Sequence, residues 1–164
     1  MQPANKINSF EAIVHRLKKT LPDSIETYHT NQTSTYPLIK IVLGKGNPQR
    51  VLISAGIHGD EPGSVESLLS FLQNEHYLPY INNWEITLLP CINPHGYEFG
   101  IRENHQGKDL NRLFKVDEPP IEVFFAQSIL SIPFELTIEL HEDNESTGYY
   151  LYQKGIDAKD DELG

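Results

Sequence analysis

Apolar side chains near the N-terminus recur at helical spacing. They are Phe10, Ile13, Val14, Leu17 and Leu21. Because residues three or four apart share one face of a helix, this pattern predicts an amphipathic helix over residues 8–20. Asn8 is the expected N-terminal cap, with Glu11 three residues later, and Pro22 ends the helix.

The rest of the chain alternates between strand and helix patterns. Strands are predicted over 25–30, 36–43, 51–57, 86–92 and 134–140. Helices are predicted over 121–130 and after the strand 51–57, where Val65, Leu68, Leu69 and Leu72 share one side. The first two strands are expected to form a hairpin, followed by a turn at 44–48. Residues 51–57 are nearly all apolar, which is typical of a strand covered on both faces. The order predicts one α/β domain over 1–164, with three layers, α/β/α, and a mixed, mostly parallel sheet.

Composition and charge exclude several classes of protein. The 164 residues are 38% hydrophobic, which is enough for one core, and the net charge of −10 with no long basic run argues against a nucleic-acid partner. No stretch approaches the roughly 18 apolar residues that a membrane span needs. The single cysteine, Cys91, is predicted to be a small buried side chain, and its isolation fits a reducing, cytoplasmic location.

His58 and Glu61 follow directly after the apolar strand 51–57. Ligands of open α/β sheets bind beyond the carboxyl ends of strands, and a His and a Glu three residues apart in a helical turn point to the same side. His141 follows the strand 134–140 and is expected at the same edge. Two His and one Glu form a zinc set with one coordination position open, which is typical of catalytic sites. On HxxE alone, loop histidines beside a helix-terminal carboxylate explain the pattern equally well.

The long polar stretch 93–115 is expected to be a loop that carries chemistry, because loops of this length are usually functional. It contains the segment 93–98, then Arg102, then Asp109, Leu110, Asn111 and Arg112. Two guanidinium groups in an acidic protein indicate a local cationic pocket, and arginine suits both carboxylate recognition and stabilisation of a developing oxyanion.

These motifs together resemble the zinc carboxypeptidase superfamily, including its succinylglutamate desuccinylase and aspartoacylase branch. The resemblance covers about residues 50–152 and rests on residues 55–62, 93–98 with Arg102, 109–112 and 139–141, all in family order. It implies His58, Glu61 and His141 as zinc ligands and Arg102 as the group that polarises the scissile carbonyl. It further implies Asn111 and Arg112 as a clamp on the substrate carboxylate, with Asp109 accepting the free ring N–H of His58.

The chain departs from the family at the general base. In the family this base is a glutamate well downstream of the second histidine ligand, and no residue here aligns with it, so an incomplete domain with weak catalysis and an exposed sheet edge is expected. The acidic residues Glu142, Asp143 and Glu145 are the candidate substitutes, but Glu142 should point away from the metal because it adjoins a ligand. The segment 149–152 is expected to be a further strand and 153–164 a polar connection.

The resulting hypothesis is a zinc metallocarboxypeptidase that hydrolyses the C-terminal amide bond of a peptide with a free carboxylate. The first alternative is an N-acyl amino acid deacylase of the desuccinylase/aspartoacylase type. The second is a zinc- or carboxylate-binding fragment without turnover. Segment 93–97 looks more like the carboxypeptidase branch, whereas segment 55–61 is common to both enzymes.

Overall fold

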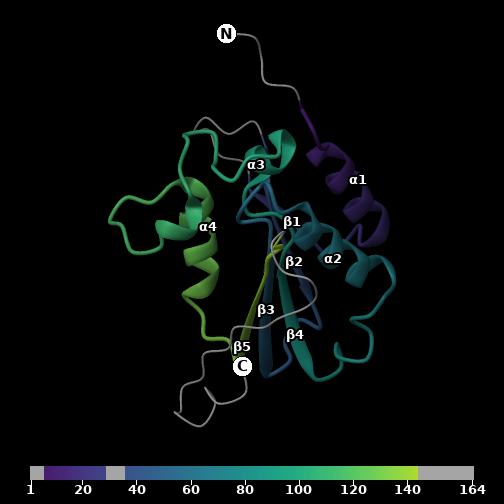
Figure 1. Cartoon of the computed structure of the whole chain (residues 1–164). Coiled ribbons are helices and arrows are strands. Elements are labelled where there is room, and N and C mark those ends of the chain that lie inside the picture. Colours follow the sequence, from purple (N-terminus) through teal and green to yellow (C-terminus); the bar gives the residue numbers. More distant parts are fainter. Residues whose placement is uncertain (1–5, 29–35, 144–164) are drawn as a thin grey trace.

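The structure is a computed structural model that describes residues 6–28 and 36–143 (Figure 1). The helices are α1 (Phe10–Thr20), α2 (Pro62–Gln73), α3 (Pro94–Phe99), the 3₁₀ turn η1 (Leu110–Arg112) and α4 (Ile121–Leu130). The strands are β1 (Ile25–Tyr28), β2 (Leu38–Leu43), β3 (Gln49–Ala55), β4 (Trp84–Leu89) and β5 (Leu136–Leu140).

The five strands form one mixed sheet in the order β1-β2-β4-β3-β5. Strand β3 pairs in parallel with β4 and β5, whereas β1–β2 and β2–β4 are antiparallel. Four of the five strands therefore point the same way, and only β2 is reversed. The predicted mixed, mostly parallel sheet and the early hairpin are both confirmed.

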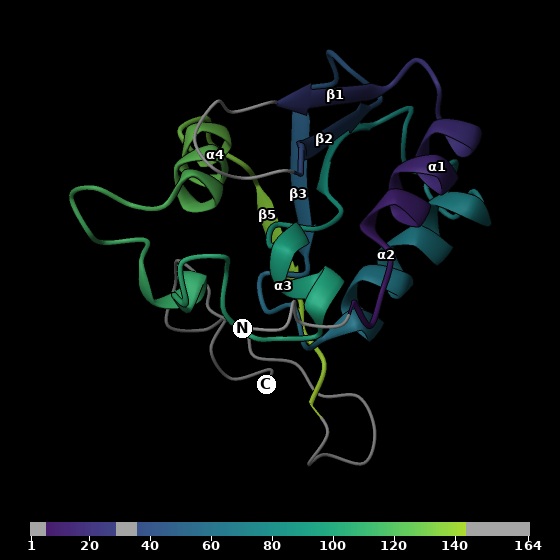
Figure 2. The same ribbon diagram turned by 90° about the horizontal axis from the view of Figure 1, so that it is seen from above.

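Helices cover both faces of the sheet, which makes the three predicted layers (Figure 2). Apolar side chains alternate along each strand between the faces. Val51 and Ala55 pack in the core under α1 and α2, whereas Leu52 packs in the core under α4. Strand β3 is thus covered on both sides, which explains its nearly continuous apolar sequence.

Some local predictions were wrong at element ends. The N-cap of α1 is Ser9, whose hydroxyl accepts from the Ala12 N–H, and not Asn8. The Asn8 side-chain amide instead donates to the Tyr97 carbonyl at 2.9 Å. Because that partner lies on a distant segment, local sequence could not reveal the competition between the two residues.

The segment 93–115 is not a plain loop, because it contains α3 and η1. Asn93 caps α3 by accepting from the Gly96 N–H at 2.9 Å, Pro94 starts it, and Gly100 ends it in the left-handed conformation with φ 61°. A helix of six residues with Gly96 inside has no clear 3.6-residue pattern, so sequence periodicity missed it.

Strand β5 is the outer strand of the sheet within the described residues, as expected for an exposed edge. It has one strand neighbour, β3, and its side chains are half-buried or exposed. None of the helices in the described part is long and apolar enough to cross a membrane. The cytoplasmic location and the single-domain boundary at 1–164 stay predictions.

Candidate metal centre

The turn between β3 and α2 carries two of the three predicted metal ligands. His58 follows β3 by three residues and is 4% exposed, and Glu61 is the N-cap residue of α2. The His58 Nδ1 atom lies 2.7 Å from Glu61 Oε1. The spacing of three residues therefore places both side chains on one side of the turn, as the sequence indicated.

The backbone of this turn is fixed by close packing on α3. A Cβ atom on Gly59 would collide with the backbone of Gly96 and Tyr97, so only glycine permits this approach. The Asn93 N–H donates to the Gly56 carbonyl at 2.8 Å, and the Ile92 N–H to the Ala55 carbonyl at 3.1 Å. The segment that follows β4 thus holds the segment that follows β3, which carries His58.

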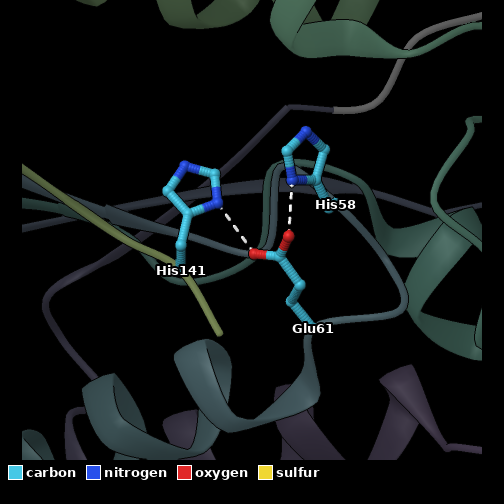
Figure 3. A group of neighbouring side chains, drawn as sticks. All are labelled: His58, Glu61 and His141. Carbon is cyan, nitrogen blue, oxygen red and sulfur yellow. Dashed lines mark hydrogen bonds and ion pairs between the residues drawn. The ribbon is translucent and has the colours of Figure 1, made fainter. Parts of the chain in front are cut away.

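His141 comes from the other side of the site, directly after the edge strand β5. Its Nδ1 lies 2.7 Å from Glu61 Oε2, so the Glu61 carboxylate lies between the two imidazoles (Figure 3). The two rings are 5.0 Å apart between centroids. One ligand atom from each of His58, Glu61 and His141 lies within 4.8 Å of the others.

Hydrogen bonds favour the ionised form of Glu61. Partial burial by itself would raise the pKa of this carboxyl, but the Glu142 N–H and then the two histidines outweigh burial and lower it. The pKa of His141 is raised to about 9, first by its hydrogen bond to Glu139 and then by Glu61, against the opposing effect of burial. Glu61 is therefore an anionic group at neutral pH.

Asp109 and Arg102 extend the centre beyond the three converging side chains. Asp109 Oδ1 lies 3.4 Å from His58 Nε2, and Asp109 Oδ2 accepts from Arg102 Nε at 3.0 Å. The Arg102 guanidinium lowers the pKa of Asp109 against the effect of burial. Arg102 Nη1 is also 3.8 Å from Glu61 Oε1. The arrangement places a cation beside the predicted metal ligands, with one edge held by Asp109.

Asn93 links Arg102 to the core. It is fully buried, and its side-chain amide donates to the Arg102 carbonyl at 3.1 Å while its Oδ1 caps α3. No individual role for Asn93 was predicted from the sequence. The Asn-Pro pair at a helix start is the signal that predicts such a cap.

Asn111 and Arg112 lie in η1, directly after Asp109. The Asn111 N–H donates to Asp109 Oδ1 at 3.0 Å, so the turn is anchored to the same carboxylate that faces His58. Asn111 is half-buried and Arg112 is exposed. The structure therefore brings their backbone to the centre, and their proposed contact with a substrate carboxylate stays a prediction.

Cys91, His95 and His105 are not members of the group of three converging side chains. Cys91 is buried, and burial raises the pKa of its thiol, which agrees with a core role. The His95 ring packs 4.8 Å from Phe99, and His105 lies 3.5 Å from the buried Glu122. Glu145 and the segment 149–164 lie outside the described residues.

Two glutamates have contacts that sequence reasoning missed. Glu98 is 4% exposed and accepts from the Phe10 N–H at 2.7 Å, so α3 anchors the start of α1. Glu142 turns its carboxylate onto the Gly63 N–H at 2.7 Å, away from the metal set as expected. Both partners are about 80 residues or more away in the chain, and no local pattern could pair them.

The donor set fits a zinc ion. Two atoms bound to one ion at about 2.0–2.1 Å are at most roughly 4.2 Å apart, so a group within 4.8 Å needs only small side-chain shifts. Imidazole nitrogen and carboxylate oxygen are ordinary zinc donors. The second ring nitrogen of His58 faces Asp109, and such a partner fixes the tautomer that leaves Nδ1 for the metal.

Comparison with known proteins identifies a matching family. Residues 47–160 match the family described as the succinylglutamate desuccinylase/aspartoacylase catalytic domain. Murein peptide amidase A of Escherichia coli (strain K12) is 38% identical over 78 residues, which cover 48% of this chain and 31% of that protein.

Solved structures of metallo-carboxypeptidases share the fold. The enzyme from Burkholderia cenocepacia superposes with a TM-score of 0.70 at 19% identity. The matched region covers 83% of this chain and 41% of the chain of that enzyme. The enzyme from Pseudomonas aeruginosa gives a TM-score of 0.68 at 23% identity, with 85% and 41% covered. The chain thus spans less than half the length of these relatives. The predicted resemblance to the zinc carboxypeptidase superfamily and the carboxypeptidase-like α/β fold are confirmed.

Proposed function

The chain belongs to the succinylglutamate desuccinylase/aspartoacylase catalytic-domain family, and on that premise we propose that it is a zinc-dependent metallocarboxypeptidase. The proposed reaction is hydrolysis of the C-terminal amide bond of a peptide. One observation carries the proposed zinc-dependent amide hydrolysis: His58, Glu61 and His141 converge within 4.8 Å, with the Arg102 guanidinium beside them.

The metal is held, in this proposal, by His58 Nδ1, the Glu61 carboxylate and His141 Nδ1. When bound, zinc supplies a Lewis acid for the scissile carbonyl oxygen and for water. Asp109 Oδ1, which lies 3.4 Å from His58 Nε2, would accept the Nε2–H of His58 and keep that ring in one tautomer. The buried turn around Gly59 keeps His58 and Glu61 in place before substrate arrives.

Arg102 is proposed to stabilise the negative charge that develops on the carbonyl oxygen. Asp109 holds its Nε atom at 3.0 Å and Nη1 lies 3.8 Å from Glu61 Oε1, so the guanidinium is oriented beside the candidate metal ligands. Positioned donors of this kind act most strongly on charge that appears only in the transition state. Arg102 should therefore contribute to the chemical step more than to substrate binding.

Asn111 and Arg112 are proposed to bind the free carboxylate of the substrate. Arginine offers a planar pair of donors that matches a carboxylate, and Arg112 is exposed. The short turn η1 places both residues next to Asp109, so binding of the carboxylate would fix the amide bond relative to the centre.

The proton-transferring group is proposed to lie outside the described residues. Glu61 faces both histidines, Asp109 is bound to Arg102, and Glu142 is bound to the Gly63 N–H. A positioned acid or base contributes roughly 10²–10⁴-fold to such reactions.

An N-acyl amino acid deacylase is the second candidate, and the name of the matched family favours it. The murein peptide amidase relative and the carboxypeptidase neighbours favour the peptide substrate. Both reactions hydrolyse an amide next to a free carboxylate, so the centre serves either. The two differ in what lies on the acyl side of the bond.

A matched substrate panel separates these functions. Zinc-loaded protein is given tripeptides with free C-termini, the same peptides as C-terminal amides, and N-acetyl and N-succinyl amino acids. We expect release of the C-terminal residue from the free peptides and loss of activity on the amidated ones. Faster hydrolysis of the N-acyl amino acids would establish the deacylase, and zinc binding without turnover of any substrate would indicate a binding fragment.

A further inference from the structure

The third candidate ligand is weakly fixed by the sheet itself. The last pair between β3 and β5 joins Ala55 and Leu140, so His141 lies just beyond the ladder. Its side chain is 35% exposed, against 4% for His58. Since β5 has no strand on its outer side within the described range, the position of His141 relative to Glu61 needs another support.

Glu142 makes two contacts that provide such a support. Its backbone N–H donates to Glu61 Oε2 at 3.1 Å, the same oxygen that faces His141. Its side-chain Oε2 accepts from the Gly63 N–H at 2.7 Å, at the start of α2. Glu142, which follows the candidate ligand His141, is thus bound both to the candidate ligand Glu61 and to the start of α2.

The start of α2 is shaped to receive this carboxylate. Pro62 has no N–H, and the N-cap residue Glu61 makes no side-chain capping bond because its carboxylate faces the histidines. The Gly63 N–H is therefore open to another acceptor. A Cβ atom on Gly63 would lie 2.8 Å from Glu142 Oε2, so the absence of a side chain there leaves room for the contact.

We propose that Glu142 is a positioning residue of the metal centre, which fastens the end of β5 to the start of α2 and so holds His141 against Glu61. This inference rests on the proposed zinc function. It differs from a purely structural capping role, in which Glu142 would stabilise α2 without any effect on metal affinity. The positioning role predicts weaker zinc binding when Glu142 is replaced, whereas the capping role predicts no change in zinc affinity.

Four variants of the 164-residue chain test the proposal by zinc affinity, measured in competition with a chromophoric chelator. Glu142→Ala removes the acceptor, and Glu142→Gln keeps an oxygen acceptor but removes the charge. Gly63→Ala keeps the charge but displaces the carboxylate, and alanine also favours helix over glycine. Glu66→Ala is the matched control, because Glu66 is an exposed carboxylate on α2 that pairs with Arg16.

We expect zinc affinity to fall roughly 10-fold or more in Glu142→Ala and Gly63→Ala, as for other residues that orient metal ligands. Glu142→Gln should remain within about threefold of the parent, since its amide oxygen can still accept from Gly63, and Glu66→Ala should match the parent. The visible spectrum of the cobalt-loaded protein should change in the two weakened variants only. Thermal melting of the metal-free proteins shows whether each variant folds.

Three results would overturn the proposal. Parent-like affinity in Glu142→Ala means capping alone, and parent-like affinity in Gly63→Ala means that the bridge is not needed. Equal weakening in Glu142→Gln and Glu142→Ala means that charge, and not position, matters. If Glu142→Ala does not fold, Gly63→Ala decides the question alone. Failure of the parent to bind zinc would instead refute the proposed function.

Discussion

The candidate centre joins a buried half to an exposed half. The buried half is the turn from β3 to α2, where His58 is 4% exposed and Gly59 lies against the backbone of α3. The exposed half is the end of β5, an edge strand whose side chains are half-buried or exposed. One half is therefore set by the core, whereas the other depends on a few polar contacts, and the two should respond differently to substitution.

Removal of the ligands gives the largest expected effect. His58→Ala and His141→Ala should each weaken zinc binding by about 10³-fold or more, because each removes one of three protein ligands. The metal-free proteins should differ, however: His58→Ala should cost about 1–3 kcal/mol of stability as a buried truncation, and His141→Ala less, because the His141 side chain is 35% exposed. Zinc competition and urea unfolding measure the two quantities. Equal loss of stability in both variants would show that the two halves do not differ in how strongly the core fixes them.

The second largest expected effect is on stability, and it comes from the packing of Gly59 against the backbone of α3. Gly59→Ala forces a methyl group into the α3 backbone, so we expect a loss of about 3 kcal/mol or failure to fold. The matched control is Thr137→Ala, on the exposed strand β5, which should cost less than about 0.5 kcal/mol. Urea midpoints compare them. A Gly59→Ala protein as stable as the parent would show that the buried half is not rigid.

The two arginines are expected to affect different kinetic parameters. Arg102 is tied to the buried half through Asp109, whereas Arg112 is exposed. Where the protein turns over an acyl dipeptide, Arg102→Ala should lower kcat by about 10²-fold, and Arg112→Ala should mainly raise KM. Steady-state kinetics on both variants measure the split. Equal and small kinetic effects of both substitutions would indicate that Arg102 and Arg112 are solvated surface charges.

The buried half could be predicted from sequence because its signals are local. The continuous apolar run of β3 reflects cover on both faces, and the HxxE spacing alone places His58 beside Glu61. The placement of His141 at the same edge followed from parallel pairing of β3 and β5. These steps need only periodicity, topology and ligand chemistry.

The contacts that complete the site were not predictable, because they join distant segments. Glu142 binds Gly63 across 79 residues, and Glu98 binds the N–H of Phe10 across 88. Helix α3 was missed because it is six residues long and contains a glycine. The cap of α1 was misplaced by one residue because Asn8 is occupied by the Tyr97 carbonyl.

A pH effect on stability is the smallest expected. Burial first, and then His105, lower the pKa of His95, against smaller opposite effects of Glu122 and Glu98. Folded protein therefore resists protonation of His95, so stability should fall as the pH drops below about 6.5 towards the folded pKa. The raised pKa of His141 acts in another window, since its contribution is complete below about 6.5 and is lost as the pH rises through about 9.

Urea unfolding of the metal-free chain between pH 5 and pH 7 measures this slope. His95→Gln should flatten it, because glutamine does not titrate, and His15→Gln is the control at an exposed position. A variant with an unchanged slope would assign the pH dependence to other groups.

We predict that the two halves jointly hold one metal ion. X-ray absorption at the zinc edge of the loaded 164-residue chain tests it most directly, because multiple scattering counts the imidazole ligands. We predict one ion per chain with two imidazoles at about 2.0–2.1 Å, and one imidazole in His141→Ala. Two imidazoles retained in His141→Ala, or a parent chain that holds no zinc, would show that the two halves do not hold one zinc ion jointly.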